Sequence, residues 1–517
     1  MNHEIYANAD KSLFKLSEEG LTDTERGKAL TELRSYVTKT RDKFLGYQTN
    51  QSLRYSPELS EYLDIQLNNV GDPFVAGDFR LNSKVFECAV LDYFAKLWNA
   101  PDRDSAEQGE GYWGYVLSMG STEGNLYALR NARDYLAGKA LWIDLNSNNH
   151  TEQGAYLEGN DNSLTPVLFY SEDTHYSIDK AKDILALPTF AEIGESRYPG
   201  QCPIKTSNGK WPTKVPSLPT GSIDLNALSI LVEFFASQGF PIVVNFNYGT
   251  TFKGALDDVS GAIDLLLPIL EKYGLKDRTL QITLENGKVV KSPRNGYWFH
   301  IDGALGASYG PFLEKAREQG IDIGVGTLPS FDFRNPIHSI VTSGHKEMGT
   351  PWPTGVYLTK QKYLLNFLSV DYIGAQDSTL AGSRNGFSAL LLWHYLARYS
   401  YNDQIESIVH RLRMSENVYQ KLRALGDELG IDLHTHRSPL SLSILFLCPS
   451  SDIVDEFSLS TEVKNGIKYA HLFVMPHVTD ELINQLIAAL RQPSAFNKIL
   501  FLDNQPQLTT ISNLSVA

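Results

Sequence analysis

Short apolar runs recur between about residues 85 and 390, and the stretches between them have the spacing of amphipathic helices. Such runs, each followed closely by polar residues, indicate buried strands. Strands that alternate with helices favour a mostly parallel sheet. Residues 85–390 are therefore predicted to form a large α/β domain, with strands in "PVLFY" (166–170), "PIVVNF" (241–246), "YWFHI" (297–301) and "SIV" (339–341).

The two flanks of this region have different patterns. Residues 1–84 are mostly polar and helix-like and have too little apolar surface to fold alone, so we expect an arm that packs on a larger body or a second subunit. Residues 391–517 begin with a helical segment. The alternating "SLSILFL" (441–447), the apolar "AHLFVM" (470–475) and the amphipathic "DELINQLIAALR" (480–491) follow it. This part is predicted to be a small C-terminal α+β domain.

Residues 190–214 and 280–293 look like insertions into the large domain. The second stretch, "LQITLENGKVVKSP", places the pair Asn286-Gly287 between alternating residues. Because such a pair favours a tight turn between antiparallel strands, we expect a β-hairpin there.

The composition narrows the classes of function. The chain has 517 residues, of which 42% are hydrophobic, and its formal net charge is -14. Without a basic footprint, neither a nucleic acid nor a membrane surface is an expected partner, and no stretch reaches the roughly 18 apolar residues of a membrane span. Cys88, Cys202 and Cys448 lie far apart without metal-ligand spacing. We therefore expect thiols of a reducing, cytoplasmic compartment and no metal site.

Polar residues follow each predicted strand of the large domain. They are "SEDTHYS" (171–177), "NYGTT" (247–251), Asp302 and "TSGHK" (342–346). Ligands of open α/β sheets bind in the crevice outside the carboxyl ends of the strands. These stretches are therefore candidates for one common site.

A Gly-Ser-Thr turn opens the predicted helix "GSTEGNLYALRNARDYLAG" (120–138). Free backbone N–H groups and the helix dipole favour an anion at such a start, so Ser121 and Thr122 are candidate phosphate ligands. An ordinary capped helix is the alternative reading of this turn.

Three further polar residues have both a structural and a functional reading. Asp302 ends an apolar run, where a carboxylate is costly unless it meets a cation such as a protonated heterocyclic nitrogen. His175 fits a core histidine, a general acid or base, or a flat ring that stacks on another ring. Thr250 fits a turn hydroxyl or a ligand contact.

Lys346 favours the functional interpretation of these residues. A lysine at the end of a buried strand, close to Gly344 and Gly349, can be desolvated and made nucleophilic, as imine formation with a carbonyl requires. A helix start for phosphate, a carboxylate for a pyridinium nitrogen, a planar histidine and an imine-forming lysine together match pyridoxal 5'-phosphate.

The sequence resembles the group II pyridoxal-phosphate-dependent amino acid decarboxylases, and within them the bacterial histidine and plant serine decarboxylases. The resemblance extends from residue 67 to residue 483. Its specific segments are "GSTEGN", "THYS", "VPSLPTGSIDLNAL", "NYGTTFKGALDD", "HIDGALGA", "TSGHK", "GSRNG" and "HRSPLSLSILFLCPS". The resemblance implies the aspartate aminotransferase-like fold, known as fold type I of the pyridoxal-phosphate-dependent transferases, and a homodimer with active sites at the interface.

The resemblance also implies a role for each site residue. Lys346 would hold the cofactor as a lysine-bound imine (internal aldimine), with Asp302 on the pyridinium nitrogen and His175 stacked on the ring. The remaining expected cofactor contacts are Ser121, Thr122, Thr250, Ala304, Ser343, His345 and, across the dimer interface, Ser383.

The implied reaction is decarboxylation of an L-amino acid to the amine and carbon dioxide. Histidine, serine, aromatic and acidic substrates all stay open. Relatives protonate the product from a tyrosine on a mobile loop, which makes Tyr372 one candidate acid, and His175 is the other. The competing readings are a carbon-carbon lyase of the sphingosine-phosphate lyase type and a retired, non-catalytic binding protein.

Overall fold

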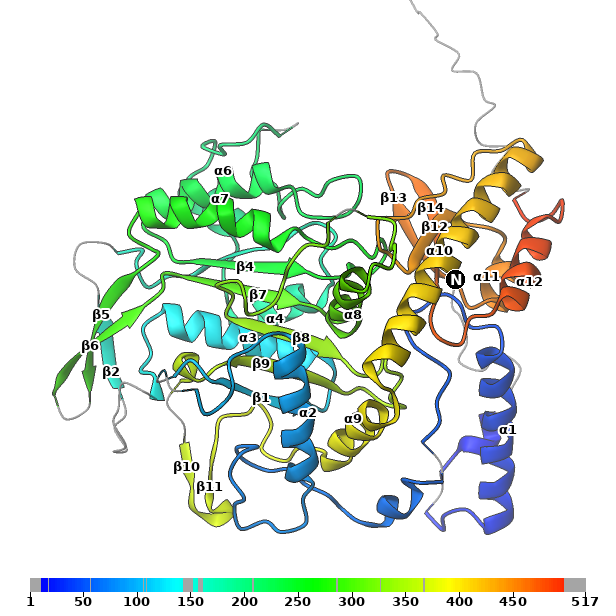
Figure 1. The fold of residues 1–517 in the computed structure, drawn as a ribbon, viewed down its shortest axis with the longest axis horizontal. Coiled ribbons are helices and arrows are strands. Elements are labelled where there is room, and N and C mark those ends of the chain that lie inside the picture. Colours follow the sequence, from blue (N-terminus) through cyan, green and yellow to red (C-terminus); the bar gives the residue numbers. More distant parts are fainter. Residues whose placement is uncertain are drawn as a thin grey trace, which may run out of the picture.

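A six-stranded sheet forms the centre of the chain (Figure 1). The computed structural model describes residues 11–496, except for 17, 56, 106, 108, 143–151, 157–160, 207–208, 285–286, 326 and 366–367. The strand order is β1-β9-β8-β7-β4-β3. The bounds are β1 (Tyr112–Leu117), β9 (Gly355–Lys360), β8 (Ser339–Ser343), β7 (Tyr297–Asp302), β4 (Ile242–Asn247) and β3 (Val167–Phe169).

The four strands predicted from the apolar runs are confirmed and lie next to one another. β3, β4, β7 and β8 pair in parallel. The other two strands, "YWGYVL" and "GVYLTK", were not predicted. β9 runs antiparallel to both β8 and β1, so the sheet is mixed but mostly parallel. This is the predicted α/β architecture.

Alternate residues of the buried strands point to opposite faces of the sheet, and helices cover both faces. Val167 and Phe169 join the large core cluster with residues of α6 (Leu225–Ser237), α7 (Val259–Lys272) and α8 (Gly306–Glu318). Leu168 lies between them in the chain and packs instead with residues of α3 (Ser121–Leu136) and α4 (Ser177–Leu185). This two-sided burial explains why the strands are apolar at nearly every position.

The predicted hairpin at 280–293 is confirmed, although Asn286 lies outside the described residues. β5 (Arg278–Leu284) pairs antiparallel with β6 (Val289–Arg294). β2 (Glu152–Tyr156) adds to β5, and the resulting small sheet extends from one end of the molecule (Figure 1). The other apparent insertion opens with α5 (Phe190–Arg197), on which Trp211 packs at Gly194.

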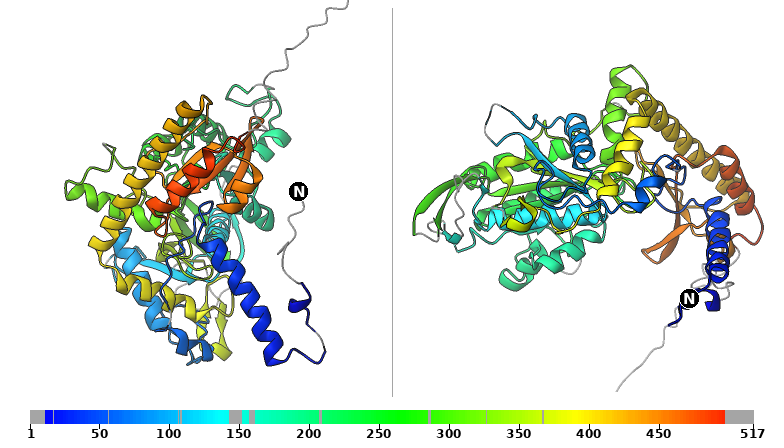
Figure 2. Two further views of the ribbon diagram at one scale, coloured as in Figure 1. Left: turned by 90° about the vertical axis from the view of Figure 1, so that its right-hand side faces the viewer. Right: turned by 90° about the horizontal axis from the view of Figure 1, so that it is seen from below.

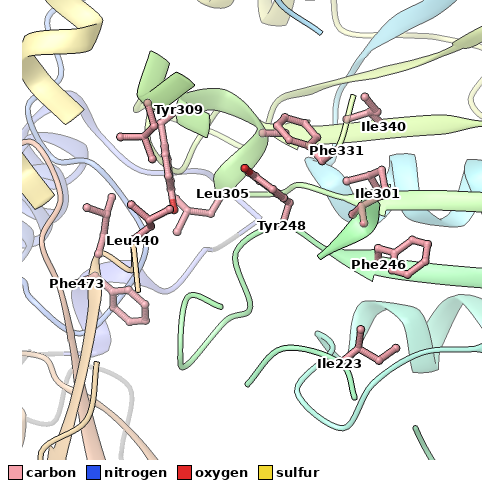
Figure 3. Close-up of a cluster of buried hydrophobic side chains, with 14 of the residues drawn as sticks. Ile223, Phe246, Tyr248, Ile301, Leu305, Tyr309, Phe331, Ile340, Leu440 and Phe473 are labelled. Atoms are coloured by element: carbon pink, nitrogen blue, oxygen red, sulfur yellow. The ribbon is translucent and has the colours of Figure 1, made fainter. Parts of the chain in front are cut away.

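The C-terminal part is an α+β unit, as predicted. It contains α10 (Tyr401–Leu429), α11 (Ser451–Glu456), α12 (Asp480–Leu490) and an antiparallel sheet of β12 (Ser443–Leu447), β14 (Ile467–Phe473) and β13 (Ser460–Lys464). Figure 3 shows that Leu440 and Phe473 of this part meet Leu305 and Tyr309 of the large part in one buried cluster. The residue boundaries of the domains stay predictions.

The N-terminal arm remains a prediction as a separate unit, and its described residues include one helix apart from the body. α1 (Asp23–Arg41) has no buried residue and stands beside the body (Figure 2). Further along, the backbone of Leu45 bonds with Phe457 and Phe473. The next helix, α2 (Lys84–Leu97), packs on α9 (Gly386–Arg398). No helix of the described residues is both long and apolar enough to cross a membrane.

Candidate active site

The carboxyl ends of β4, β7 and β8 lie side by side at one edge of the sheet. Parallel pairing sets Asn247 opposite Asp302, and Asp302 opposite Val341. The loops that follow these strands, and the loop after β3 that carries His175, therefore start from the same edge. The convergence predicted from the sequence is confirmed at the level of the strands.

Lys346 lies in a tight connection between β8 and β9. Gly344 closes the connection, because its N–H donates to the carbonyl of Thr354 (2.8 Å) and its own carbonyl accepts from Thr350 N (3.1 Å). Burial lowers the pKa of the Lys346 ammonium, and attraction to the Asp302 carboxylate opposes that shift only in part. The neutral amine, which is the nucleophilic form, is therefore more populated than in a free lysine.

Asp302 is 5% exposed and is held by two donors. Its Oδ2 accepts from Asn125 Nδ2 (2.8 Å), and its Oδ1 accepts from the backbone N–H of Ala304 (3.2 Å). Neither donor carries a charge. The carboxylate therefore retains the capacity to bind a cation from the open side of the site.

His175 is half-buried beside this pair. Its Nδ1 accepts from the backbone N–H of Ser177 (3.2 Å) and lies 2.9 Å from Ser177 Oγ. Burial lowers its pKa, the positive charge of Lys346 lowers it further, and Asp302 opposes both. Lys346, Asp302 and His175 thus lie close enough to influence one another's charge.

The start of α3 faces the lysine connection. Gly120 precedes the helix with φ 64 and, as a glycine, has no side chain that could cap this end. The N–H of Ser121 donates to Ser343 Oγ (3.2 Å), the two hydroxyl oxygens lie 2.8 Å apart, and Thr122 is exposed. A Cβ on Gly120 would lie 2.6 Å from Cε1 of His345. Backbone N–H groups and hydroxyls thus gather where the helix dipole favours an anion.

Two of the remaining predicted residues lie at the site edge. Thr250 is 3% exposed, and its hydroxyl oxygen accepts from Ala255 N (2.9 Å), which leaves its proton free to donate. Ala304 is half-buried, and its carbonyl accepts from Ser343 N (3.1 Å).

Ser383 and Tyr372 lie on the surface of the protomer and are not brought into this group. The Ser383 hydroxyl accepts from Asn68 Nδ2 (3.2 Å). Tyr372 is 84% exposed between β10 (Leu368–Val370) and β11 (Ala375–Asp377). The roles of both residues in the site therefore stay predictions.

Asn125 was not singled out from the sequence, although it contacts Asp302 directly. It lies one helical turn after Ser121, and residues four apart share a helix face. A polar residue at that spacing behind a candidate phosphate turn was the available signal. Asn50 was missed as well: its backbone N–H donates to the carbonyl of Lys346 (2.9 Å).

These residues fit pyridoxal phosphate. The start of α3 beside Ser343 and His345 matches a phosphate, the Asp302 carboxylate matches a protonated ring nitrogen, and the buried Lys346 matches a carbonyl partner. Each of these cofactor groups would thus have a chemically complementary group of the chain as its partner.

Comparison with known proteins agrees with this chemistry. Residues 82–431 match the family model described as the pyridoxal-dependent decarboxylase conserved domain. The histidine decarboxylase of Vibrio campbellii is 31% identical over 480 residues, which cover 92% of this chain and 96% of that protein. Serine decarboxylase 3 of Oryza sativa is 31% identical over 445 residues, covering 86% of this chain and 76% of that protein.

Solved structures give the same result. The L-methionine decarboxylase of Streptomyces sp. 590 superposes with a TM-score of 0.87 at 42% identity, over 93% of this chain and 97% of that chain. Sphingosine-1-phosphate lyase of Burkholderia pseudomallei, at 16% identity and a TM-score of 0.62, shares the fold alone. This chain belongs to the pyridoxal-dependent decarboxylase family, and it is an amino acid decarboxylase that depends on pyridoxal 5'-phosphate.

Proposed function

We propose that this enzyme decarboxylates an L-amino acid with an uncharged side chain, and that L-methionine is the first candidate. The observation that carries the choice is the 42% identity to a methionine decarboxylase over nearly the whole chain, against about 30% for the histidine and serine decarboxylases.

The charged groups next to the site support an uncharged substrate. Lys253 pairs with Asp173 at 3.2 Å, and Arg411 pairs with Glu347 at 2.7 Å. Asp173 belongs to the loop of His175, and Glu347 follows Lys346 in the chain. A charged substrate side chain would have to compete with these pairs, whereas an apolar one would leave them intact.

Leu440 adds apolar surface close to the site. It is 4% exposed and lies in the cluster with Leu305, which follows Ala304 in the chain (Figure 3). Its backbone has φ 62, a left-handed conformation that is strained for leucine. The surrounding packing must therefore hold this side chain in place.

Each residue of the site has a defined task in the proposed reaction. Bound pyridoxal phosphate supplies the electron sink for the bond that breaks. Lys346 carries the cofactor and yields to the substrate amine, Asp302 retains the proton of the ring nitrogen, and His175 covers one ring face. The residues that hold the phosphate are those at the helix start and next to it, namely Ser121, Thr122, Ser343 and His345. Thr250 and Ala304 lie against the ring.

A homodimer with active sites at the interface completes the proposal. α1 leaves Leu30, Tyr36 and Val37 exposed. Between residues 47 and 85 a further series of large apolar side chains is exposed, namely Tyr47, Leu53, Leu63, Ile65, Val75, Phe79, Leu81 and Val85. So much apolar surface in one stretch is typical of a subunit interface. At such an interface, Ser383 and Tyr372 would contribute to the active site of the partner subunit.

A cytoplasmic location fits the cysteines. Cys88, Cys202 and Cys448 all carry free thiols. Burial raises the pKa of each thiol, so none is activated as a nucleophile.

The experiment that tests the substrate is carbon dioxide release from a panel of L-amino acids: methionine, histidine, serine, an aromatic and an acidic one. Purified enzyme is supplied with pyridoxal phosphate, and Lys346→Ala is the control. Release from methionine that is lost in the variant supports the proposal. Release from an acidic or basic amino acid alone overturns it, and an aldehyde product without carbon dioxide would identify a lyase.

A further inference from the structure

Asn125 is a buried amide at the centre of the candidate site. It is 1% exposed on α3 and has polar neighbours on both sides. Its Nδ2 faces Asp302 Oδ2 at 2.8 Å and Ser177 Oγ at 3.2 Å, and its Oδ1 faces His300 Nε2 at 3.0 Å. Every hydrogen-bonding group of this amide therefore has a buried partner.

The Asp302 carboxylate determines how the amide points. A carboxylate only accepts, so the group of Asn125 that faces it must be the NH₂ group. The carbonyl oxygen of Asn125 then faces His300, and Nε2 of His300 must carry the proton. Burial lowers the pKa of His300 to about 4, so this ring is neutral and its Nδ1 is an acceptor.

The hydrogen bond at the other ring nitrogen of His300 agrees with this orientation of the Asn125 amide. Its Nδ1 lies 2.8 Å from Ser339 Oγ, which can donate to it because Ser339 Oγ itself accepts from Trp298 Nε1 at 3.2 Å. His300 and Ser339 are both fully buried. The orientation of the Asn125 amide is thus fixed from two directions.

The second N–H of Asn125 contributes to the state of His175 through the hydroxyl of Ser177. It donates to Ser177 Oγ, which leaves the hydroxyl proton of Ser177 directed at His175 Nδ1. The backbone N–H of Ser177 also points at that nitrogen. Since Nδ1 accepts, the proton of the neutral His175 ring lies on Nε2.

We infer that Asn125 is a positioning residue that couples the two cofactor contacts: one amide group holds the Asp302 carboxylate and, together with the backbone N–H of Ser177, keeps His175 as the Nε2–H tautomer. This role rests on the proposed use of Asp302 and His175 for the ring of pyridoxal phosphate. The same amide group thus bonds to Asp302 directly and to His175 through Ser177, although Asp302 and His175 follow different strands.

The first test is cofactor affinity. Asn125→Leu keeps the approximate volume of the side chain and removes its hydrogen bonds. The matched control is Asn131→Leu, because Asn131 lies on the same helix, is also 1% exposed and bonds Tyr357 instead of a site residue. Titration of cofactor-stripped protein with pyridoxal phosphate should show binding about tenfold to a hundredfold weaker for Asn125→Leu and unchanged for Asn131→Leu.

The second test needs neither cofactor nor activity. The ring nitrogens of ¹⁵N-histidine-labelled, stripped protein report the tautomer of each histidine by NMR, and His175→Gln assigns the His175 signals. Wild type should show His175 as the Nε2–H tautomer, and Asn125→Leu should show a larger fraction of the Nδ1–H tautomer, because only the backbone N–H of Ser177 then holds Nδ1 as an acceptor.

A second pair of variants covers the case in which Asn125→Leu does not fold. His300→Gln keeps a donor toward Asn125, whereas His300→Leu removes it. We expect His300→Gln to retain both the affinity and the tautomer, and His300→Leu to lose both in part. Unchanged affinity and tautomer in Asn125→Leu, or an equal loss of affinity in Asn131→Leu, would overturn the inference. If Asn125→Leu shows both effects but wild-type enzyme releases carbon dioxide from no amino acid, the inference stands and the proposed function fails, which separates the two hypotheses.

Discussion

Gly120 and His345 touch so closely that a methyl group does not fit between them. A Cβ on Gly120 would lie 2.6 Å from Cε1 of His345 and 3.2 Å from its Nδ1. Gly120 precedes α3, and His345 precedes Lys346 in the chain. The helix start and the lysine connection are therefore packed directly on each other.

Gly120→Ala should weaken cofactor binding more than its effect on stability suggests. Gly120 has φ 64 and ψ -167, a region essentially restricted to glycine, so alanine costs about 1–3 kcal/mol through the backbone alone, and the clash must also displace His345. Gly274→Ala is the control, since Gly274 has φ 68 and nothing within 4 Å of its Cβ position. We expect both variants to lose thermal stability and only Gly120→Ala to lose affinity, by about tenfold. Equal affinities would contradict this reading of the contact.

The lowered pKa of Lys346 predicts a pH-dependent stability of the stripped protein. The folded pKa lies below the ordinary value of about 10.4, so between the two values the unfolded chain binds more protons. Stability should therefore rise with pH through that window. In urea unfolding from about pH 7 to about pH 10, wild type should gain stability relative to Lys346→Met. A constant difference between the two proteins would mean that the lysine is not desolvated.

Removing one partner of the buried ion pair between Arg411 and Glu347 should lower the free energy of unfolding strongly. Their side chains are only 4% and 5% exposed. Arg411→Met leaves a buried carboxylate without its partner and should cost about 3–5 kcal/mol. Arg491→Met, which breaks an exposed pair with Glu428, should change the free energy of unfolding little. Similar unfolding midpoints for the two variants would show that Glu347 finds other partners.

Tyr372→Phe should affect turnover without affecting stability. The ring is 84% exposed in the protomer, so loss of its hydroxyl changes no packing there. If this hydroxyl protonates the product in the partner's site, kcat should fall about 10²-fold or more at unchanged melting temperature and cofactor affinity. Hybrid dimers of Tyr372→Phe with Lys346→Ala subunits check the geometry. They should regain part of the activity, because one of their two sites combines an intact lysine with an intact tyrosine.

Val85→Glu should disrupt the proposed dimer. Val85 is 75% exposed within the apolar stretch between residues 47 and 85. A carboxylate there would be buried on association, which is costly. Val463→Glu is the control, since Val463 is 69% exposed on β13. Sedimentation velocity should show a lighter species only for Val85→Glu, and two proteins of equal size would remove this surface from the interface.

The predictable part of the fold was the part in which burial leaves a continuous apolar run. β4 and β7 were visible for that reason. β1 was missed because "YWGYVL" carries two tyrosines and a glycine, although all six residues are buried. β9 was missed because its run "GVYLTK" is short and ends in polar residues. Its place in the sheet depends on pairing with β1, which is distant in sequence, as in the register of Tyr112 with Lys360.

The site was predictable where one residue type has few uses. A lysine at a strand end and an aspartate after an apolar run both suggest chemistry, and Lys346 and Asp302 do lie together. Asn125 gave no comparable signal, because a buried asparagine in a helix has many structural uses. The partner of Tyr372 could not be read from the sequence either, because an exposed side chain on a hairpin carries no record of what covers it.

The bonds from Asn50 to the lysine connection set an order of events during synthesis. The side chain of Asn50 donates to the carbonyl of Glu347, 297 residues further along the chain. At roughly 5–20 residues per second, the ribosome needs about 15–60 s to cover that distance. The arm therefore emerges long before its partner exists, and these bonds to the connection that holds Lys346 can form only after about two thirds of the chain has been made. A chaperone that shields the arm during this interval would act on the maturation of the active site itself.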